Sequence, residues 1–191
     1  MDDHSINSAD INRAVINPFD VLNDYERRSL AHQPGTPEQI DAPGLWRGVC
    51  FRLGNRRLAS SFAEVVEIIT VPAMTSIPGG LSWLLGIANV RGNLLPVVDL
   101  KQFLEGQRTV LHQNQRALVI KQSGGNVAVL VDELLGQRHF VDSQKHEVGT
   151  LTEGRYADFV SQAYRLSDIT YGVFSMALLT RTSEFRQAAA A

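Results

Sequence analysis

The chain has 191 residues, of which 44% are hydrophobic and 20% charged, and its formal net charge at pH 7 is −2. This length suits one domain plus extensions, and the charge is too balanced to indicate binding to nucleic acid or anionic lipid. The single cysteine, Cys50, cannot form an internal disulfide, the N-terminus lacks a signal-peptide pattern, and no apolar run approaches the ~20 residues of a membrane span. We therefore expect a cytoplasmic protein that does not insert into a membrane.

Residues 1–43 are polar and contain several prolines, which predicts a flexible arm. Asn17-Pro18 can begin a helix, and apolar side chains recur near helical spacing as far as Arg28. The sequence thus predicts a short amphipathic helix over residues 17–28. We favour packing of this helix on its own domain, with docking on a partner as the alternative.

Folded structure is expected to begin near Leu45. Alternating apolar residues predict a strand over 49–53 and a returning strand over 56–60, joined by a glycine turn. Ser61 and Glu64 have the spacing of a capping box, which predicts a short helix over 63–66 and then an extended segment over 67–71.

The densest apolar run, residues 84–100, is typical of a β-hairpin followed by a helix start. A glycine at position 92 can take the positive φ of a tight turn, so the turn is predicted at residues 91–93. Pro96 has no amide hydrogen, so we expect its strand to lie at a sheet edge or to carry a bulge there. Asp99 is the predicted N-cap of a helix over 100–105 that ends at Gly106.

After a polar link at 107–115, the order of strand, glycine turn, strand and short acidic helix recurs, and this predicts two similar subdomains. The second series has expected strands at 117–121, 127–131, 137–141, 160–166 and 169–174. A helix-prone step is predicted at 132–135, and Ser175 is the predicted N-cap of a final helix over 176–179. Many short strands with glycine turns favour small β-barrels over a parallel α/β sheet.

The sequence shows no pattern typical of a catalytic, metal-binding or phosphate-binding site. The five histidines show no metal-ligand spacing, no phosphate-binding glycine loop is present, and Cys50 has no acid or base beside it in the sequence. We predict no catalytic site, no metal and no cofactor. A β-barrel hydrolase would depend on Cys50 alone, and a small-barrel nucleic-acid-binding module, the main alternative function, would need a basic groove with stacking aromatic residues.

The hairpin carries the pattern Gly-x-x-Asn-x-Arg-Gly followed by Pro-Val-x-Asp-Leu, formed here by Gly86, Asn89, Arg91, Gly92, Pro96, Val97, Asp99 and Leu100. In this pattern the chain resembles the CheW family, the adaptor proteins of bacterial chemosensory arrays. The resemblance covers about residues 44–180 and leaves an arm (1–43) and a C-terminal helix end and tail (181–191). It implies an all-β fold of two intertwined five-stranded SH3-like barrels.

The resemblance also implies a non-enzymatic adaptor that couples the cytoplasmic tip of a methyl-accepting receptor to the regulatory domain of a CheA-type histidine kinase. The long N-terminal arm and residues 83–92, 136–140 and 171–174 are more similar to the adaptors of type IV pilus twitching-motility systems within this family. By the same resemblance, Val65, Glu67 and Arg91 are the expected receptor-binding residues, and an exposed apolar barrel face is expected to bind the kinase. The structural alternative is a Glu67–Arg91 ion pair that only braces the hairpin.

Overall fold

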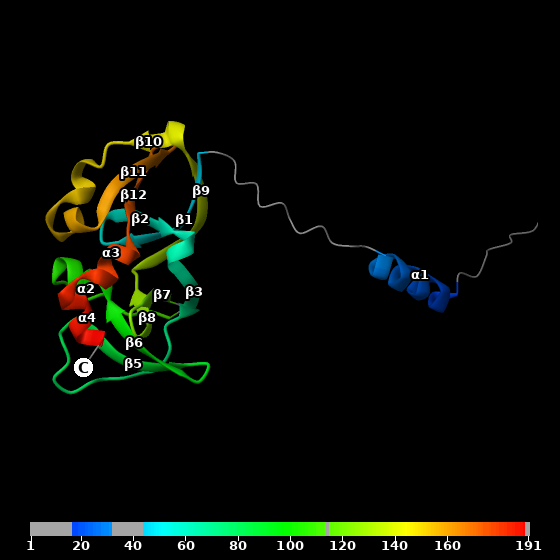
Figure 1. Ribbon diagram of the computed structural model, residues 1–191, viewed down its shortest axis with the longest axis horizontal. Helices are drawn as coiled ribbons and strands as arrows, with labels where there is room; N and C mark the ends of the chain where they lie inside the picture. The colour runs from blue at the N-terminus through cyan, green and yellow to red at the C-terminus, as the bar shows by residue number, and fades with distance from the viewer. Residues whose placement is uncertain (1–16, 32–43, 114, 190–191) are drawn as a thin grey trace, which may run out of the picture. The chain divides into compact units, whose positions relative to one another are not determined.

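The computed structural model describes residues 17–31, 44–113 and 115–189 (Figure 1). They belong to two compact units, which divide between Asp41 and Ala42. In the first unit, helix α1 (Pro18–Ala31) extends three residues beyond the predicted end. Asn17 accepts a hydrogen bond from the amide of Phe19 at 3.1 Å, which satisfies one of the free donors at the helix start. The rest of the predicted arm lies outside the described residues.

The described part of the second unit contains two mixed sheets. Sheet A has the strand order β10-β11-β12-β2-β1-β9, and sheet B has the order β3-β7-β8-β6-β5-β4. The strands of sheet A are β1 (Leu45–Leu53), β2 (Arg56–Ser61), β9 (Glu133–Val141), β10 (Lys145–His146), β11 (Val160–Leu166) and β12 (Ile169–Phe174). The strands of sheet B are β3 (Val65–Thr70), β4 (Met74–Thr75), β5 (Leu84–Val90), β6 (Asn93–Asp99), β7 (Arg116–Gln122) and β8 (Gly125–Leu130).

The chain crosses twice between the sheets. It begins in sheet A with β1 and β2, builds all of sheet B with β3 to β8, and returns to sheet A with β9 to β12 (Figure 1). Each sheet contains five strands of six residues or more and one of two residues. The structure thus confirms the expected intertwined, mainly β fold.

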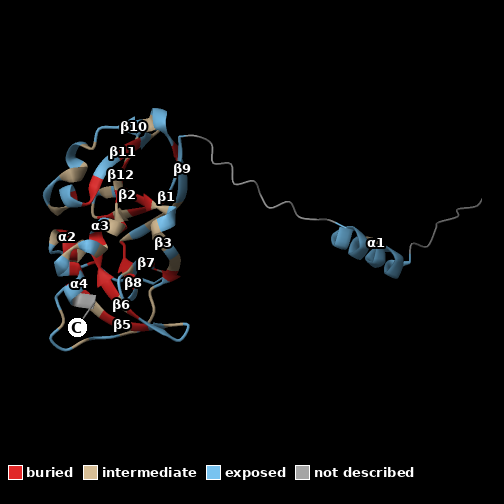
Figure 2. Cartoon of the chain, in the orientation of Figure 1, coloured by how far each residue is buried: buried red, intermediate tan, exposed pale blue. Residues whose placement is uncertain are grey.

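The folded unit has three apolar clusters, and two of them explain why each sheet is curled. One cluster is enclosed by sheet B and takes residues from all five of its long strands: Ile69, Ala88, Leu95, Val97, Ala117, Val119 and Ala128. A second is enclosed in the same way by sheet A: Cys50, Ala59, Phe140, Tyr164 and Tyr171. A compact cluster can contact five strands only if the sheet bends around it, which is barrel geometry. The third and largest cluster draws on both sheets and on helices of the second unit. Figure 2 shows buried segments, coloured red, in both sheets.

Two successive stretches of chain have the same strand pairing. In the first half (residues 45–105) and in the second half (116–181), a hairpin is followed by a strand that joins the other sheet. Single-residue bulges occur at equivalent places in the two halves: Val66 and Leu135, and Leu85 and Ser161. Parallel pairing then joins β6 to β8 in one half and β12 to β2 in the other. The register therefore assigns an equivalent in one half to most strand residues of the other.

The two predicted N-caps are confirmed. The Asp99 carboxylate accepts from the amide of Gln102 at 3.1 Å at the start of α2 (Leu100–Glu105), and also from the amide and hydroxyl of Thr109 at 2.7 and 2.8 Å. The Ser175 hydroxyl accepts from the amide of Leu178 at the start of α3 (Met176–Arg181). A further helix, α4 (Ser183–Ala189), follows where only a helix end and tail were expected, and its Phe185 is buried in the shared cluster.

The predicted helix over 63–66 is wrong, because only one 3-10 turn, η1 (Phe62–Glu64), forms before β3 begins. Ser61 accepts from the amide of Ala63, but Glu64 does not complete a capping box. Its carboxylate instead accepts from the hydroxyl of Ser175 and from the amides of Met176 and Ala177 at 3.1 to 3.2 Å. The free amides at the start of α3 offer it several donors, whereas the capping box offers one.

The predicted edge position of Pro96 is also wrong, since β6 lies between β5 and β8. The bulge in the β5–β6 pair lies at Leu85, opposite Val97 and Val98, and not at the proline. An interior strand tolerates Pro96 because its parallel pairing with β8 begins only at Val97, so the missing amide removes no bond from that ladder.

The helix-prone step predicted at 132–135 is wrong as well. Strand β9 begins at Glu133 and pairs with β1 along its length. The guanidinium of Arg52 on β1 donates to the Glu133 carboxylate at 2.9 Å. Pairing with a strand more than 80 residues away in sequence therefore overrides the local preference.

Candidate functional site

The β5–β6 hairpin fixes the position of Arg91. Arg91 and Gly92 both have positive φ values, 52° and 85°, so the two-residue turn belongs to the type favoured by the twist of paired strands. The amide of Gly92 donates to the side-chain oxygen of Asn89 at 2.8 Å, which holds the turn from outside the ladder. The turn lies where the sequence predicted it, and it presents the arginine at the tip of a rigid ribbon.

Arg91 forms an ion pair with Glu67. The Arg91 Nη2 and Glu67 Oε1 atoms are 2.6 Å apart, and the arginine side chain is 77% exposed while the glutamate is 31% exposed. Glu67 lies on the edge strand β3, and three strands of sheet B separate β3 from β5, so only the curl of the sheet brings the two residues together. Because solvent screens such a pair, it contributes only about 0 to 1 kcal/mol to stability. The arginine therefore remains available to a partner.

Val65 does not share a face with this pair. Residues two positions apart on a regular strand point to the same face, but the bulge at Val66 lies between Val65 and Glu67. Val65 is paired with Ile120 and packs against the shared cluster, whereas Glu67 is paired with Val119, which belongs to the cluster enclosed by sheet B. The structure therefore unites two of the three predicted site residues and leaves Val65 half-buried on the other face of β3.

An apolar hollow lies beside the same hairpin. It has a volume of about 410 Å³. We call it the β4–β5 groove, and its lining residues are Ala73, Thr75, Ser76, Ile77, Pro78, Ile87, Asn89 and Leu94. Leu94 is 70% exposed, and no lining residue is charged. A contiguous apolar hollow around an exposed leucine is typical of a protein-binding surface.

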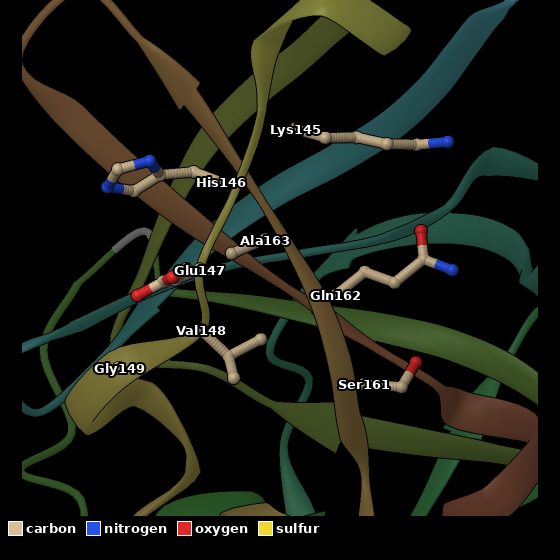
Figure 3. A pocket seen from close by; sticks show the side chains of 8 residues that line it. All are labelled: Lys145, His146, Glu147, Val148, Gly149, Ser161, Gln162 and Ala163. Atoms are coloured by element: carbon tan, nitrogen blue, oxygen red, sulfur yellow. The ribbon is translucent and has the colours of Figure 1, made fainter.

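The second half has an equivalent hollow. It has a volume of about 590 Å³. We call it the β10–β11 pocket, and its lining residues are Lys145, His146, Glu147, Val148, Gly149, Ser161, Gln162 and Ala163. By the strand register, His146 and Ala163 correspond to Thr75 and Ile87. Figure 3 shows Val148 directed towards β11, with Lys145 and His146 extending to either side. The same place in the fold is thus lined by uncharged residues in one half, whereas in the other half Lys145, His146 and Glu147 border an apolar surface.

Cys50 is placed unfavourably for nucleophilic chemistry. It has no exposed surface and belongs to the cluster enclosed by sheet A. Burial raises the pKa of the Cys50 thiol to about 11, and the neighbouring Arg138 charge offsets this effect only in part. At neutral pH the thiol is therefore protonated and poorly nucleophilic.

In the described part of the chain, no group of three or more His, Cys, Asp or Glu side chains lies together as metal ligands would. None of its helices is both long and apolar enough to cross a membrane.

The sequence interpretation missed the β4–β5 groove. Ile87 and Leu94 belong to the dense apolar run, from which the sequence predicted only a hairpin, and no role was predicted for Ile77. A signal was available, because β5 carries apolar residues on both of its faces. In a small barrel only one face of such a strand can line the enclosed cluster, so the other must meet the shared core or a partner.

The family model of the CheW-like domain matches residues 47–183, well over half of the chain. The chain belongs to the CheW-like family. This confirms the resemblance carried by the hairpin motif.

Several CheW-like proteins are similar to the chain. PilI of Pseudomonas aeruginosa is 37% identical over 126 residues, which are 66% of this chain and 71% of PilI. FrzA of Myxococcus xanthus is 34% identical over 47% of this chain and 56% of FrzA. The chemotaxis protein CheW of Helicobacter pylori is 23% identical over 59% of this chain and 68% of that CheW. The crystal structure of the scaffolding protein TtCheW from Thermoanaerobacter tengcongensis matches with a TM-score of 0.63 at 20% identity, over 75% of this chain and 93% of TtCheW. The similarity to PilI bears out the expected relation to pilus-type adaptors.

Proposed function

We propose that this chain is a cytoplasmic, non-enzymatic adaptor of a type IV pilus chemosensory system. It couples the cytoplasmic tip of a methyl-accepting receptor to the regulatory domain of a CheA-type histidine kinase. Membership in the CheW-like family and the similarity to PilI support a chemotaxis-type signalling adaptor. The observation that carries the finer proposal is that one hairpin bears both an exposed cation, Arg91, and an exposed apolar residue, Leu94.

The β4–β5 groove is the proposed kinase surface. It is apolar, and Leu94 and Ile87 project from a hairpin whose register is fixed by pairing on both sides of β6. A barrel of the kinase regulatory domain would cover this face, since burial of apolar side chains in a central patch supplies most of the affinity of such interfaces.

The Glu67–Arg91 pair is the proposed receptor surface. A cation held at a rigid turn can meet a carboxylate on the receptor's helical hairpin, and charges of this kind set the register and the association rate more than the affinity. Val65 lies on the other face of β3 and remains a proposed contact by family resemblance alone. Its half-buried side chain would meet a receptor helix only along the edge of the shared cluster.

Calorimetric titration of the chain with the kinase regulatory domain from the same organism tests the kinase surface. We expect micromolar or tighter binding, and a weakening of about tenfold or more in Leu94→Asp because an unpaired carboxylate would be buried at the contact. Val110→Asp is the matched control, since Val110 is an exposed apolar residue outside the groove. Undetectable binding, or equal weakening in both variants, contradicts the proposal.

A further inference from the structure

Helix α1 carries an exposed apolar stripe. Its apolar side chains Phe19, Leu22 and Tyr25 recur every three residues and are all exposed, and no residue of the helix is buried (Figure 2). The helix is stabilised from its own polar side, where Asp24 pairs with Arg27 and Arg28 at 2.9 and 2.6 Å. A helix that holds itself together in this way has its apolar stripe available for another surface.

Charge is unevenly divided along the chain. Residues 1–43 contain eight acidic and three basic side chains, whereas residues 44–191 contain 12 acidic and 15 basic ones. Within the folded unit, the segments that build sheet A, 44–62 and 133–182, carry nine basic and six acidic side chains, while residues 63–132 carry five of each. The acidic arm is therefore complementary in charge to the part of the fold that forms sheet A.

Sheet A contains the β10–β11 pocket. Val148 and Ala163 supply an apolar floor, and the exposed Lys145 and His146 stand at its rim (Figure 3). The rim is not purely basic, because Glu147 also lines it and Lys145 pairs with Asp142 at 2.9 Å. The pocket thus offers an apolar surface for the apolar stripe of an amphipathic helix, next to a cation that can face Glu26, a carboxylate of α1 with no ion pair within the helix.

We propose that α1 of one copy docks in the β10–β11 pocket of a second copy, so that two chains exchange their helices in a symmetric dimer. Phe19 and Leu22 enter the apolar floor, and Glu26, which lies between them on a helical wheel, faces Lys145 of the other copy. A single helix of 14 residues offers too small a face for a stable dimer, but mutual exchange buries two such faces. This self-association is independent of the proposed adaptor function.

Sedimentation equilibrium of the full chain over a wide concentration range tests the proposal. We expect a monomer–dimer equilibrium that weakens about tenfold or more in Leu22→Asp, since the new carboxylate would be buried against Val148. Asn23→Asp is the matched control, because it adds the same charge about 100° further round the helix, and it should leave the dimer intact. α1 has no buried residue, so these variants do not threaten the fold.

A charge exchange locates the contact. Lys145→Glu should weaken the dimer several-fold, and the double variant Lys145→Glu with Glu26→Lys should recover it. A monomer at every concentration overturns the proposal, whether the helix docks in its own chain or on another protein. If Leu22→Asp leaves the dimer affinity unchanged, α1 does not form the contact. If Lys145→Glu leaves it unchanged, the helix does not dock in the β10–β11 pocket.

Discussion

The two halves of the folded unit share their strand order, bulges and parallel pairing, yet they expose different chemistry. The turn position held by Arg91 in the first half is held by Ser167 in the second, and both residues have positive φ. The position of Glu67 on β3 is held on β9 by Gly136. Packing constrains the strands, whereas turns and sheet edges can diverge, and the candidate site lies where the halves have diverged.

The halves also differ in how they fit side chains at one bulge. Gly86 follows the bulge on β5 with φ of 152°, and a Cβ there would lie 2.3 Å from the carbonyl oxygen of Thr75. Its equivalent on β11 is Gln162, which is exposed. We expect Gly86→Ala to lower the free energy of unfolding by about 3 kcal/mol or more, because backbone must move, and Gln162→Ala to lower it by less than about 0.5 kcal/mol. Urea unfolding of both variants measures this difference, and similar values would show that the bulges are equivalent in strain as well as in position.

Loss of an N-cap should also lower the free energy of unfolding more in the first half than in the second. The difference between the halves should be smaller than for the bulge variants. Asp99 is buried and accepts three hydrogen bonds, whereas Ser175 shares its role with Glu64. Asp99→Ala should therefore cost about 3 kcal/mol, since it removes the N-cap of α2 and leaves the buried amide of Thr109 unpaired, and Ser175→Ala about 1 kcal/mol. The measurement is again urea unfolding, and a larger loss for Ser175→Ala would contradict this ranking.

Cys50 should make the free energy of unfolding fall in alkaline solution. Its equivalent in sheet B is Val119, which does not titrate. Because burial raises the pKa of Cys50 from 9.0 to about 11, its contribution is complete below pH 9 and is lost as pH rises towards 11. The loss is on the order of 2 kcal/mol.

The variant Cys50→Val should flatten the fall in unfolding free energy between pH 9 and 11. Burial and a hydrogen bond to Glu105 also raise the pKa of Tyr156, so some slope of the same sign should remain. An unchanged slope in Cys50→Val would mean that the thiol titrates normally in the folded chain. Chemical denaturation at a series of pH values provides the slopes.

The smallest expected effect on stability concerns the ion pair. Arg91→Ser gives the first turn the residue found in the second and should change the free energy of unfolding by less than about 0.5 kcal/mol, because the Arg91 side chain is largely exposed. A loss of 2 kcal/mol or more would mean that the pair mainly braces the hairpin. Thermal unfolding of the variant beside the parent chain is sufficient.

Features set by neighbours in sequence were predictable. The turn at Arg91, the caps at Asp99 and Ser175, and the strands β11 and β12 depend on residues only a few positions apart. Features that depend on residues far away in the sequence could not be predicted. Glu64 caps a helix more than 100 residues away, and β9 starts early because β1 pairs with it.

The candidate site also has parts that the sequence predicted and parts that it did not. The family resemblance indicated Arg91 and Glu67 as receptor-binding residues, and the curl of sheet B brings them together in the ion pair that was the structural alternative to that role. The bulge that turns Val65 to the other face has no signature in the local sequence, because Val65, Val66 and Ile68 suit either face equally. The β4–β5 groove depends on β4 pairing with β5 across a loop, which hydrophobic periodicity alone does not reveal.

Calorimetric titration with the receptor's cytoplasmic tip tests most directly whether the first half alone carries the receptor site. Three chains are compared: the parent, Arg91→Ser, and Arg91→Ser with Ser167→Arg, which moves the cation to the equivalent turn of the second half. We predict that both variants bind at least about tenfold more weakly than the parent. Parent-like affinity in Arg91→Ser, or its recovery in the double variant, would contradict the account.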